Sequence, residues 1–149
     1  MKVIVQRAQN ATCEVAQDIT GSIDFGYMLL VGFTHGDSLA EVCHMAKKII
    51  GLRIFEDEQG KLNKSILEVG GSILAISQFT LYADAKKGNR PSFTSAMHYQ
   101  EANPLFNEFV EELKSYNISV ETGIFGANMK IQFTNVGPIT IILDSKDLM

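Results

Sequence analysis

The amino-acid sequence predicts an α+β protein in which two main helices pack against a mostly antiparallel, barrel-like β core. Three observations predict this class. Short stretches of alternating or β-branched residues outnumber the helical stretches, and the two amphipathic helices fall between groups of strands rather than after each strand. No GxGxxG or Walker spacing marks a doubly wound nucleotide-binding fold. Because 149 residues suit one domain and no linker or repeat divides them, residues 1–149 are expected to form a single domain.

The expected strands are short and spread along the whole chain. They cover residues 2–7, 11–15, 27–33, 53–56, 72–82, 129–134 and 139–143. Gly70 and Gly71 in the segment EVGGS predict a hairpin turn before the strand at 72–82. Between the last two strands lies NVGPIT, where Gly137 and Pro138 interrupt the most strand-like region. Proline cannot donate to a sheet ladder and glycine weakens a strand, so this interruption needs a reason.

Two helices are predicted from apolar residues at helical spacing. The first covers about residues 39–52, and Ser38 with Glu41 predicts a capping box at its start. The second carries an apolar stripe over residues 102–113 with Pro104 inside it. Either Asn103 caps a helix that starts at Pro104, or a longer helix starts near His98 and is kinked. The early start of the stripe favours the longer helix.

Composition and charge exclude several classes of function. The net charge of −4 argues against a general nucleic-acid binder. No apolar run is long enough to span a bilayer, and the N-terminus does not resemble a signal peptide, so a cytoplasmic protein is expected. The two cysteines, Cys13 and Cys43, are then expected to be free thiols. The three histidines form no HxxxH or HExxH motif, so no metal site is predicted.

One basic cluster stands out from the acidic background. Lys86, Lys87 and Arg90 lie in DAKKGNRPSF, which glycine and proline mark as a loop. Such a loop is either simply solvated or contacts a few phosphates of an RNA with weak, salt-sensitive affinity.

The strongest candidate site lies in SQFTLYAD, residues 77–84, at the end of the strand expected over 72–82. Strand alternation places Gln78 and Thr80 on one face and Ser77 and Phe79 on the other. Gln78 and Thr80 can hydrogen-bond a ligand, or they can satisfy each other.

Two more features point beyond simple packing. In FGANM, residues 125–129, small residues let a ligand approach the backbone closely, unless the segment is a plain hairpin. Arg7 falls on the face of Val3 and Val5, which is expected to be the core. A buried guanidinium needs acceptors, which carbonyls of a broken strand could supply; otherwise Arg7 reaches water past the strand end.

Three motifs together resemble one protein family. SQFTLYAD (77–84), KGNRPSF (87–93) and NVGPIT (135–140) are similar to motifs of D-aminoacyl-tRNA deacylases, also called D-tyrosyl-tRNA deacylases. The opening MKVIVQRA and the turn TGIFGANM fit the same family, and the resemblance runs from the first residue to the last. It implies a homodimer with a barrel-like β core and two active sites at the subunit interface.

The resemblance also implies an activity. Members of the family hydrolyse the ester that joins a D-amino acid, or glycine, to the terminal adenosine of tRNA, a proofreading reaction of translation that needs no cofactor. In the family the Gly–Pro peptide, here Gly137–Pro138, is cis and enters the partner's active site. Its carbonyls there approach the α-carbon of the aminoacyl group, so an L side chain is sterically excluded.

The resemblance implies that Ser77, Gln78, Phe79 and Thr80 form the catalytic part of the site. Backbone N–H groups near Phe79 and Thr80 are then expected to donate hydrogen bonds to the oxyanion. Thr80 is one candidate nucleophile, but its hydroxyl needs a base. In the second mechanism the ribose 2′-OH of the terminal adenosine assists the attack. Because no matched motif contains a histidine or a carboxylate positioned as a base, the sequence favours the second mechanism.

The resemblance assigns substrate binding to two further regions. Phe125, Gly126, Ala127 and Met129 are expected to help form the adenosine pocket, and Arg7 is expected to hold the Gly137–Pro138 loop. Two other functions compete with the deacylase. One is a non-catalytic dimeric module that binds an RNA end or a small ligand, and the other is a serine or threonine esterase acting on small free esters.

Overall fold

Five strands form one mixed sheet in the order β6-β5-β2-β1-β7 in the computed structural model, which describes all 149 residues. The elements follow the chain as β1 (Lys2–Val15), β2 (Asp18–Gly32), α1 (Leu39–Gly51), β3 (Phe55–Glu56), β4 (Leu62–Lys64), α2 (Ile66–Val69), β5 (Ser72–Ser77), the 3₁₀ helix η1 (Phe79–Tyr82), α3 (Tyr99–Lys114), β6 (Val120–Thr122), β7 (Lys130–Asp144) and α4 (Ser145–Leu148). β3 and β4 pair with each other in a separate small hairpin.

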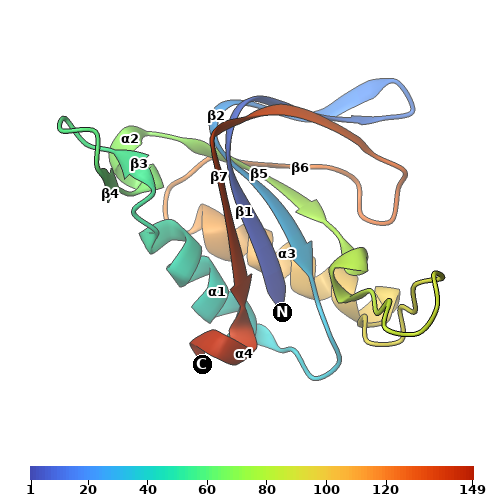
Figure 1. Cartoon of the computed structure of the whole chain (residues 1–149). Helices are drawn as coiled ribbons and strands as arrows, with labels where there is room; N and C mark the ends of the chain where they lie inside the picture. Colours follow the sequence, from blue (N-terminus) through green and yellow to red (C-terminus); the bar gives the residue numbers. More distant parts are fainter.

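The sheet is antiparallel on one side and parallel on the other. β1 pairs antiparallel with β2 and with β7, whereas β5 runs parallel to both β2 and β6. Its two edge strands, β6 and β7, do not pair, so the sheet stays open (Figure 1). The expected barrel-like closure is therefore wrong, while the expected α+β class is confirmed.

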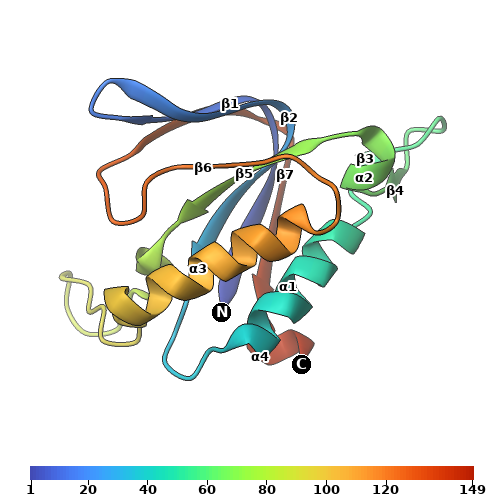
Figure 2. The same cartoon turned by 180° about the vertical axis from the view of Figure 1, so that it is seen from behind.

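Helices α1 and α3 lie side by side against one face of the sheet (Figures 1 and 2). The larger core fills this layer, with Val5 and Leu29 from the sheet against Ile49 and Phe109 from the helices. Neighbouring residues of a strand point to opposite faces, and Met28 beside Leu29 is buried as well. Met28 belongs to a smaller cluster on the other face, which the far ends of β1 and β7 help to cover.

Helix α1 begins as the sequence predicts. The Ser38 hydroxyl accepts a hydrogen bond from the Ala40 N–H at 3.2 Å, and Glu41 accepts one from the Ser38 N–H at 2.6 Å, which together form the predicted capping box. Helix α3 starts at Tyr99 with His98 as its N-cap and includes Pro104, which confirms the longer of the two alternatives.

Removing the cap at Ser38 is expected to destabilise the protein measurably. Ser38→Ala should lower the free energy of unfolding by about 1 kcal/mol, because N-terminal N–H groups of α1 lose their acceptor. The bonds from Ser38 lower the pKa of Glu41. The bonds to the Glu41 carboxylate should therefore contribute fully above the ordinary glutamate pKa and fade as pH falls through the lowered value, whereas the bond from the Ala40 N–H to the Ser38 hydroxyl does not depend on pH. Urea titrations would measure this, with Ser22→Ala, at an exposed strand position, as the control.

The strand predicted over residues 72–82 is wrong in its second half. β5 ends at Ser77, and the chain turns into η1, where Leu81 donates to the Gln78 carbonyl and Ala83 to the Thr80 carbonyl. These local bonds replace a sheet partner, because the parallel ladder with β2 ends where Ser77 pairs with Val31. The alternation argument for Gln78 and Thr80 therefore fails.

The expected hairpin at Gly70 and Gly71 is also wrong. Gly70 is the left-handed C-cap of α2, with φ +69°, and its N–H donates to carbonyls at the start of that helix. A capping box of Ser65 and Glu68 starts α2, and this signal is present in the sequence. The short β4, β6 and α4 were not predicted either.

Strands predicted separately are continuous in the structure. Residues 2–7 and 11–15 both belong to β1, and residues 129–134 and 139–143 fall almost entirely within β7. The interruption predicted at NVGPIT is a bulge within β7. Gln6 pairs with Thr140 and Ala8 with Asn135, so residues 136–139 lie opposite the single residue Arg7.

Candidate active site

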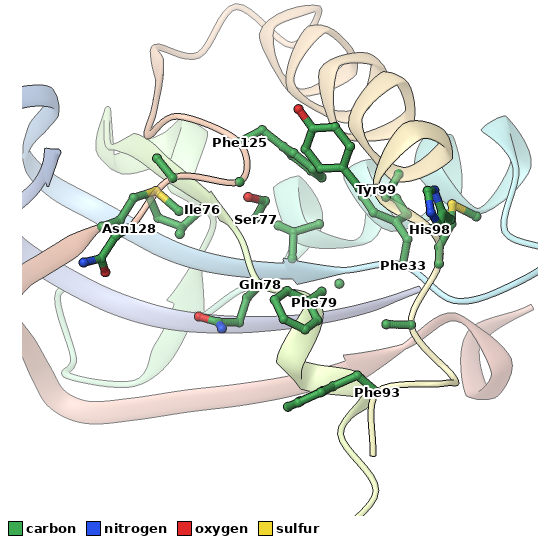
Figure 3. A pocket seen from close by; sticks show the side chains of 18 of the residues that line it. Phe33, Ile76, Ser77, Gln78, Phe79, Phe93, His98, Tyr99, Phe125 and Asn128 are labelled. Carbon is green, nitrogen blue, oxygen red and sulfur yellow. The ribbon is translucent and has the colours of Figure 1, made fainter. Parts of the chain in front are cut away.

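A pocket of about 670 Å³ opens where the end of β5, the start of α3 and the segment before β7 meet (Figure 3). Most of its wall is apolar, with a few polar groups from Ser77, Gln78, His98 and Asn128. A large, mostly apolar concavity with few polar groups is the usual form of a small-molecule site.

One wall comes from the SQFTLYAD segment. Ser77 ends β5, Gln78 follows, and Phe79 begins η1 with an exposed ring. As the first residues of η1, Phe79 and Thr80 carry backbone N–H groups that have no acceptor inside the turn. Free N–H groups at the edge of a pocket can stabilise negative charge on a ligand oxygen.

Thr80 lies just outside the pocket wall. Its hydroxyl accepts a hydrogen bond from Gln78 Nε2. Of the two alternatives left open by the sequence, the structure therefore shows the one in which these two side chains satisfy each other. Neither a histidine nor a carboxylate bonds to the Thr80 hydroxyl. The geometry therefore provides no general base for this hydroxyl.

The opposite wall comes from the turn predicted to bind a ligand. Phe125 packs on Tyr99 of α3 (Figure 3), with ring centroids 5.3 Å apart. Ala127 and Met129 also line this side of the pocket. Gly126 has φ +80°, and a Cβ there would lie 3.0 Å from Cε2 of Tyr99. A larger residue at position 126 would therefore narrow the pocket and strain the turn.

Three aromatic lining residues were missed by sequence reasoning. Tyr99 and Phe33 line the pocket, and Phe93 contacts Phe79 edge-to-face at 5.2 Å at its mouth. Phe93 lies in the KGNRPSF motif, and this motif was the only signal in the sequence for any of the three.

Gly137 and Pro138 do not reach the pocket of their own chain. They are exposed at the tip of the β7 bulge, and the peptide bond between them is cis. The base of the bulge is closed by Asn135, which donates from Nδ2 to the Thr140 hydroxyl at 3.1 Å and accepts from the Ile139 N–H at 3.3 Å. The bulge is therefore exposed, but hydrogen bonds at its base hold its backbone in a defined conformation.

Arg7 lies behind this bulge and is buried, at 5% exposure. Its Nη1 donates to the Ile54 carbonyl at 3.2 Å and to Glu56 Oε2 at 2.7 Å. These acceptors come from the segment around β3, not from carbonyls of the broken strand as the sequence suggested. The same hydrogen bond from Arg7 lowers the pKa of Glu56. A Cβ on Gly137 would lie 3.4 Å from Arg7 Nη2, which places the guanidinium directly against the bulge.

The basic loop lies beyond η1 and does not line the pocket. Lys86, Lys87 and Arg90 are all exposed, and none of them forms an ion pair. No group of three metal-ligating side chains occurs in the structure, and no helix is both long and apolar enough to cross a membrane.

The chain resembles known proteins along its whole length. A family model described as D-Tyr-tRNA(Tyr) deacylase matches residues 4–144. A D-aminoacyl-tRNA deacylase of Anoxybacillus flavithermus is 52% identical over 98% of this chain and 100% of its own, and one of Thermus aquaticus is 46% identical over 99% and 97%. A solved structure of the c-Myc DNA Unwinding Element Binding Protein superposes with a TM-score of 0.90 at 38% identity, covering 97% of this chain and 98% of that one.

Proposed function

This chain belongs to the D-Tyr-tRNA(Tyr) deacylase family, and on that premise we propose that the 670 Å³ pocket is where its reaction takes place. The chain is a D-aminoacyl-tRNA deacylase, a hydrolase of carboxylic esters that acts in translational proofreading, and aminoacyl-tRNA is its substrate. We further propose that residues 1–149 work as one domain in the cytoplasm.

The proposal that the reaction takes place in this pocket is supported by one observation: two motifs that are distant in the sequence both line it. Ser77, Gln78 and Phe79 form one side, and Phe125 to Met129 form the other. The terminal adenosine lies against the Phe125–Met129 side, where aromatic and small residues accept a flat base. The ester then lies at the start of η1, within reach of the N–H groups of Phe79 and Thr80.

The reaction breaks the bond between the carbonyl carbon of the amino acid and the ribose oxygen. Water adds to the carbonyl, the tRNA recovers its hydroxyl group, and the amino acid leaves as a carboxylic acid. The N–H groups of Phe79 and Thr80 stabilise the oxyanion that forms during the attack. Because Thr80 has no base, the ribose 2′-OH assists the attack, and the protein contributes position and charge stabilisation.

Chiral selection is the role of Gly137 and Pro138 in this proposal. Their exposure on the bulge, away from their own pocket, suits insertion into the pocket of a second copy in a homodimer. Backbone atoms held against the α-carbon leave no room for an L side chain. Glycine has no side chain, so glycyl-tRNA is accepted as well. Arg7 supports the bulge from behind.

Thr80→Ala is expected to keep at least one tenth of the deacylation rate. The ribose hydroxyl remains in place, and the substitution removes only a hydroxyl group that has no general base beside it. Single-turnover release of D-tyrosine from D-Tyr-tRNA would measure this. A loss of 1,000-fold or more in a folded, tRNA-binding variant would return Thr80 to the role of nucleophile.

The proposed function is tested by comparing two D-tyrosyl esters. The protein should release D-tyrosine from D-Tyr-tRNA and leave D-tyrosine ethyl ester essentially intact, because the adenosine supplies both binding energy and the assisting hydroxyl. Turnover of both esters at similar rates would indicate a general esterase. Binding of D-Tyr-tRNA without any turnover would indicate a non-catalytic module.

A further inference from the structure

Two exposed phenylalanine rings lie at the mouth of the candidate active site. Phe79 is 57% exposed and Phe93 is 40% exposed, and both residues line the pocket. Their rings contact each other edge-to-face, with centroids 5.2 Å apart. In Figure 3 this pair lies on the side of the pocket away from Phe125 and Tyr99. The mouth therefore carries an apolar surface that is separate from the wall at which the adenosine is placed.

Backbone hydrogen bonds hold both rings of this pair in position. Ser92, which precedes Phe93, exchanges two backbone hydrogen bonds of 2.8 Å with Asp84, just beyond the end of η1. Just before η1 starts, the Gln78 N–H donates to the Val31 carbonyl of β2 at 2.7 Å. Because the backbone on each side is fixed in this way, the apolar surface exists before any ligand binds.

The chemistry of the pocket favours an apolar group on this surface. Burying the face of a phenylalanine ring is favourable, and a second aromatic ring in edge-to-face or offset contact adds to this. No Asp, Glu, Lys or Arg occurs among the residues that line the pocket. A charged group of a ligand would lose water there without gaining an ion-pair partner. The surface therefore suits an aromatic or long apolar group.

We propose that the Phe79–Phe93 pair binds the side chain of the D-amino acid, so that the protein favours aromatic and long apolar D-amino acids. The proposal rests on the proposed function, because it takes the ester to lie at the start of η1. There the N–H groups of Phe79 and Thr80 bind the carbonyl oxygen, so the α-carbon lies next to Phe79. The bulge of a second copy fills the space of an L side chain, and the D side chain extends through the mouth along the two rings.

Phe93→Ala tests the proposal because it removes one ring of the pair and leaves the N–H donors of η1 in place. The probes are two non-hydrolysable ligands in which D-tyrosine or D-alanine is joined through an amide to 3′-amino-3′-deoxyadenosine. The methyl group of D-alanine is too small to cover either ring, so the unmodified protein should bind the D-tyrosyl ligand more tightly. Isothermal titration calorimetry should show the ratio of the D-tyrosyl Kd to the D-alanyl Kd rising about tenfold in the variant, since an aromatic contact is lost.

Two further variants serve as controls. Phe93→Tyr keeps an aromatic ring at the mouth and should keep the ratio of the two Kd values. Phe25→Ala removes a ring of nearly the same exposure, 39%, from β2, where it does not line the pocket. This variant should also leave the ratio unchanged, which separates a contact with the ligand from the general effect of removing an exposed ring.

The calorimetry distinguishes the amino-acid side chain from other contacts of Phe93. An unchanged ratio in Phe93→Ala would overturn the proposal. Equal weakening of both ligands would show that Phe93 supports the pocket as a whole, and would overturn it too. An unchanged ratio with weaker binding of a D-tyrosyl tRNA minihelix would assign the ring to an RNA base instead. Failure of the unmodified chain to release D-tyrosine from D-Tyr-tRNA would count against the proposed function, whereas the ratio would still decide the role of the Phe79–Phe93 pair.

Discussion

Replacing Arg7 with methionine is expected to lower the free energy of unfolding by about 2–3 kcal/mol and to remove most of the deacylase activity. Arg7 is 5% exposed, and its guanidinium donates to the Ile54 carbonyl and to Glu56. Methionine fills a similar space but cannot donate, so the buried Ile54 carbonyl is left without this partner. The bulge with Gly137 also loses the group packed behind it.

Glu56→Gln is the control for the charge of this pair. The Glu56 side chain is 49% exposed, so losing the ion pair alone should cost less than about 1 kcal/mol. Urea titration and single-turnover deacylation would measure both variants. An Arg7→Met protein with the stability and activity of the unmodified chain would show that Arg7 supports neither the fold nor the bulge.

Replacing Gly137 with alanine is expected to lower kcat/KM for D-Tyr-tRNA by about 100-fold. The residue has φ +118°, and an added Cβ would lie 3.0 Å from Cγ1 of Ile139 and 3.2 Å from its backbone nitrogen. An L residue is strained at this φ, and relieving the contacts also needs a shift of a few tenths of an ångström, so the bulge must change its shape. A displacement of up to about 1 Å at a reacting centre can cost about 100-fold in rate.

Gly60→Ala separates this effect from ordinary backbone strain. Gly60 also has a positive φ, of +76°, but a Cβ there would meet nothing within 4 Å. It lies between β3 and β4, outside the lining of the candidate site. This variant should lose some stability and keep its activity. An active Gly137→Ala protein, or an inactive Gly60→Ala protein, would contradict the role given to the bulge.

Locally encoded features were predicted well from the sequence. The capping box at Ser38 and the start of α3 near His98 depend on residues within one turn of the helix, so they could be read directly. The bulge at Gly137 and Pro138 was predicted as an interruption, because both residues are unsuited to a regular ladder. The family was identified from the three motifs, and the comparisons confirm it.

Features that depend on distant partners were predicted less well. FTLY has strand-forming residues, yet it forms η1 because the β2 ladder ends at Val31. The open sheet depends on which strands pair, and periodicity carries no such information. The acceptors of Arg7 lie about fifty residues away along the chain, near β3, so only the fold could identify them.

The lining of the candidate site was predicted only where it belongs to a family motif. Phe79 and Phe125 line one pocket although 45 residues separate them, and the motif match anticipated both. Tyr99 and Phe33 line it without belonging to any of those motifs, so nothing in the sequence marked them.

The most direct test compares D-Tyr-tRNA and L-Tyr-tRNA, charged on the same tRNA, as substrates of the unmodified protein. We expect rapid release of D-tyrosine and essentially intact L-Tyr-tRNA, because backbone atoms of the bulge would occupy the place of an L side chain. Equal rates on the two substrates would contradict the central claim that this protein selects its substrate by chirality.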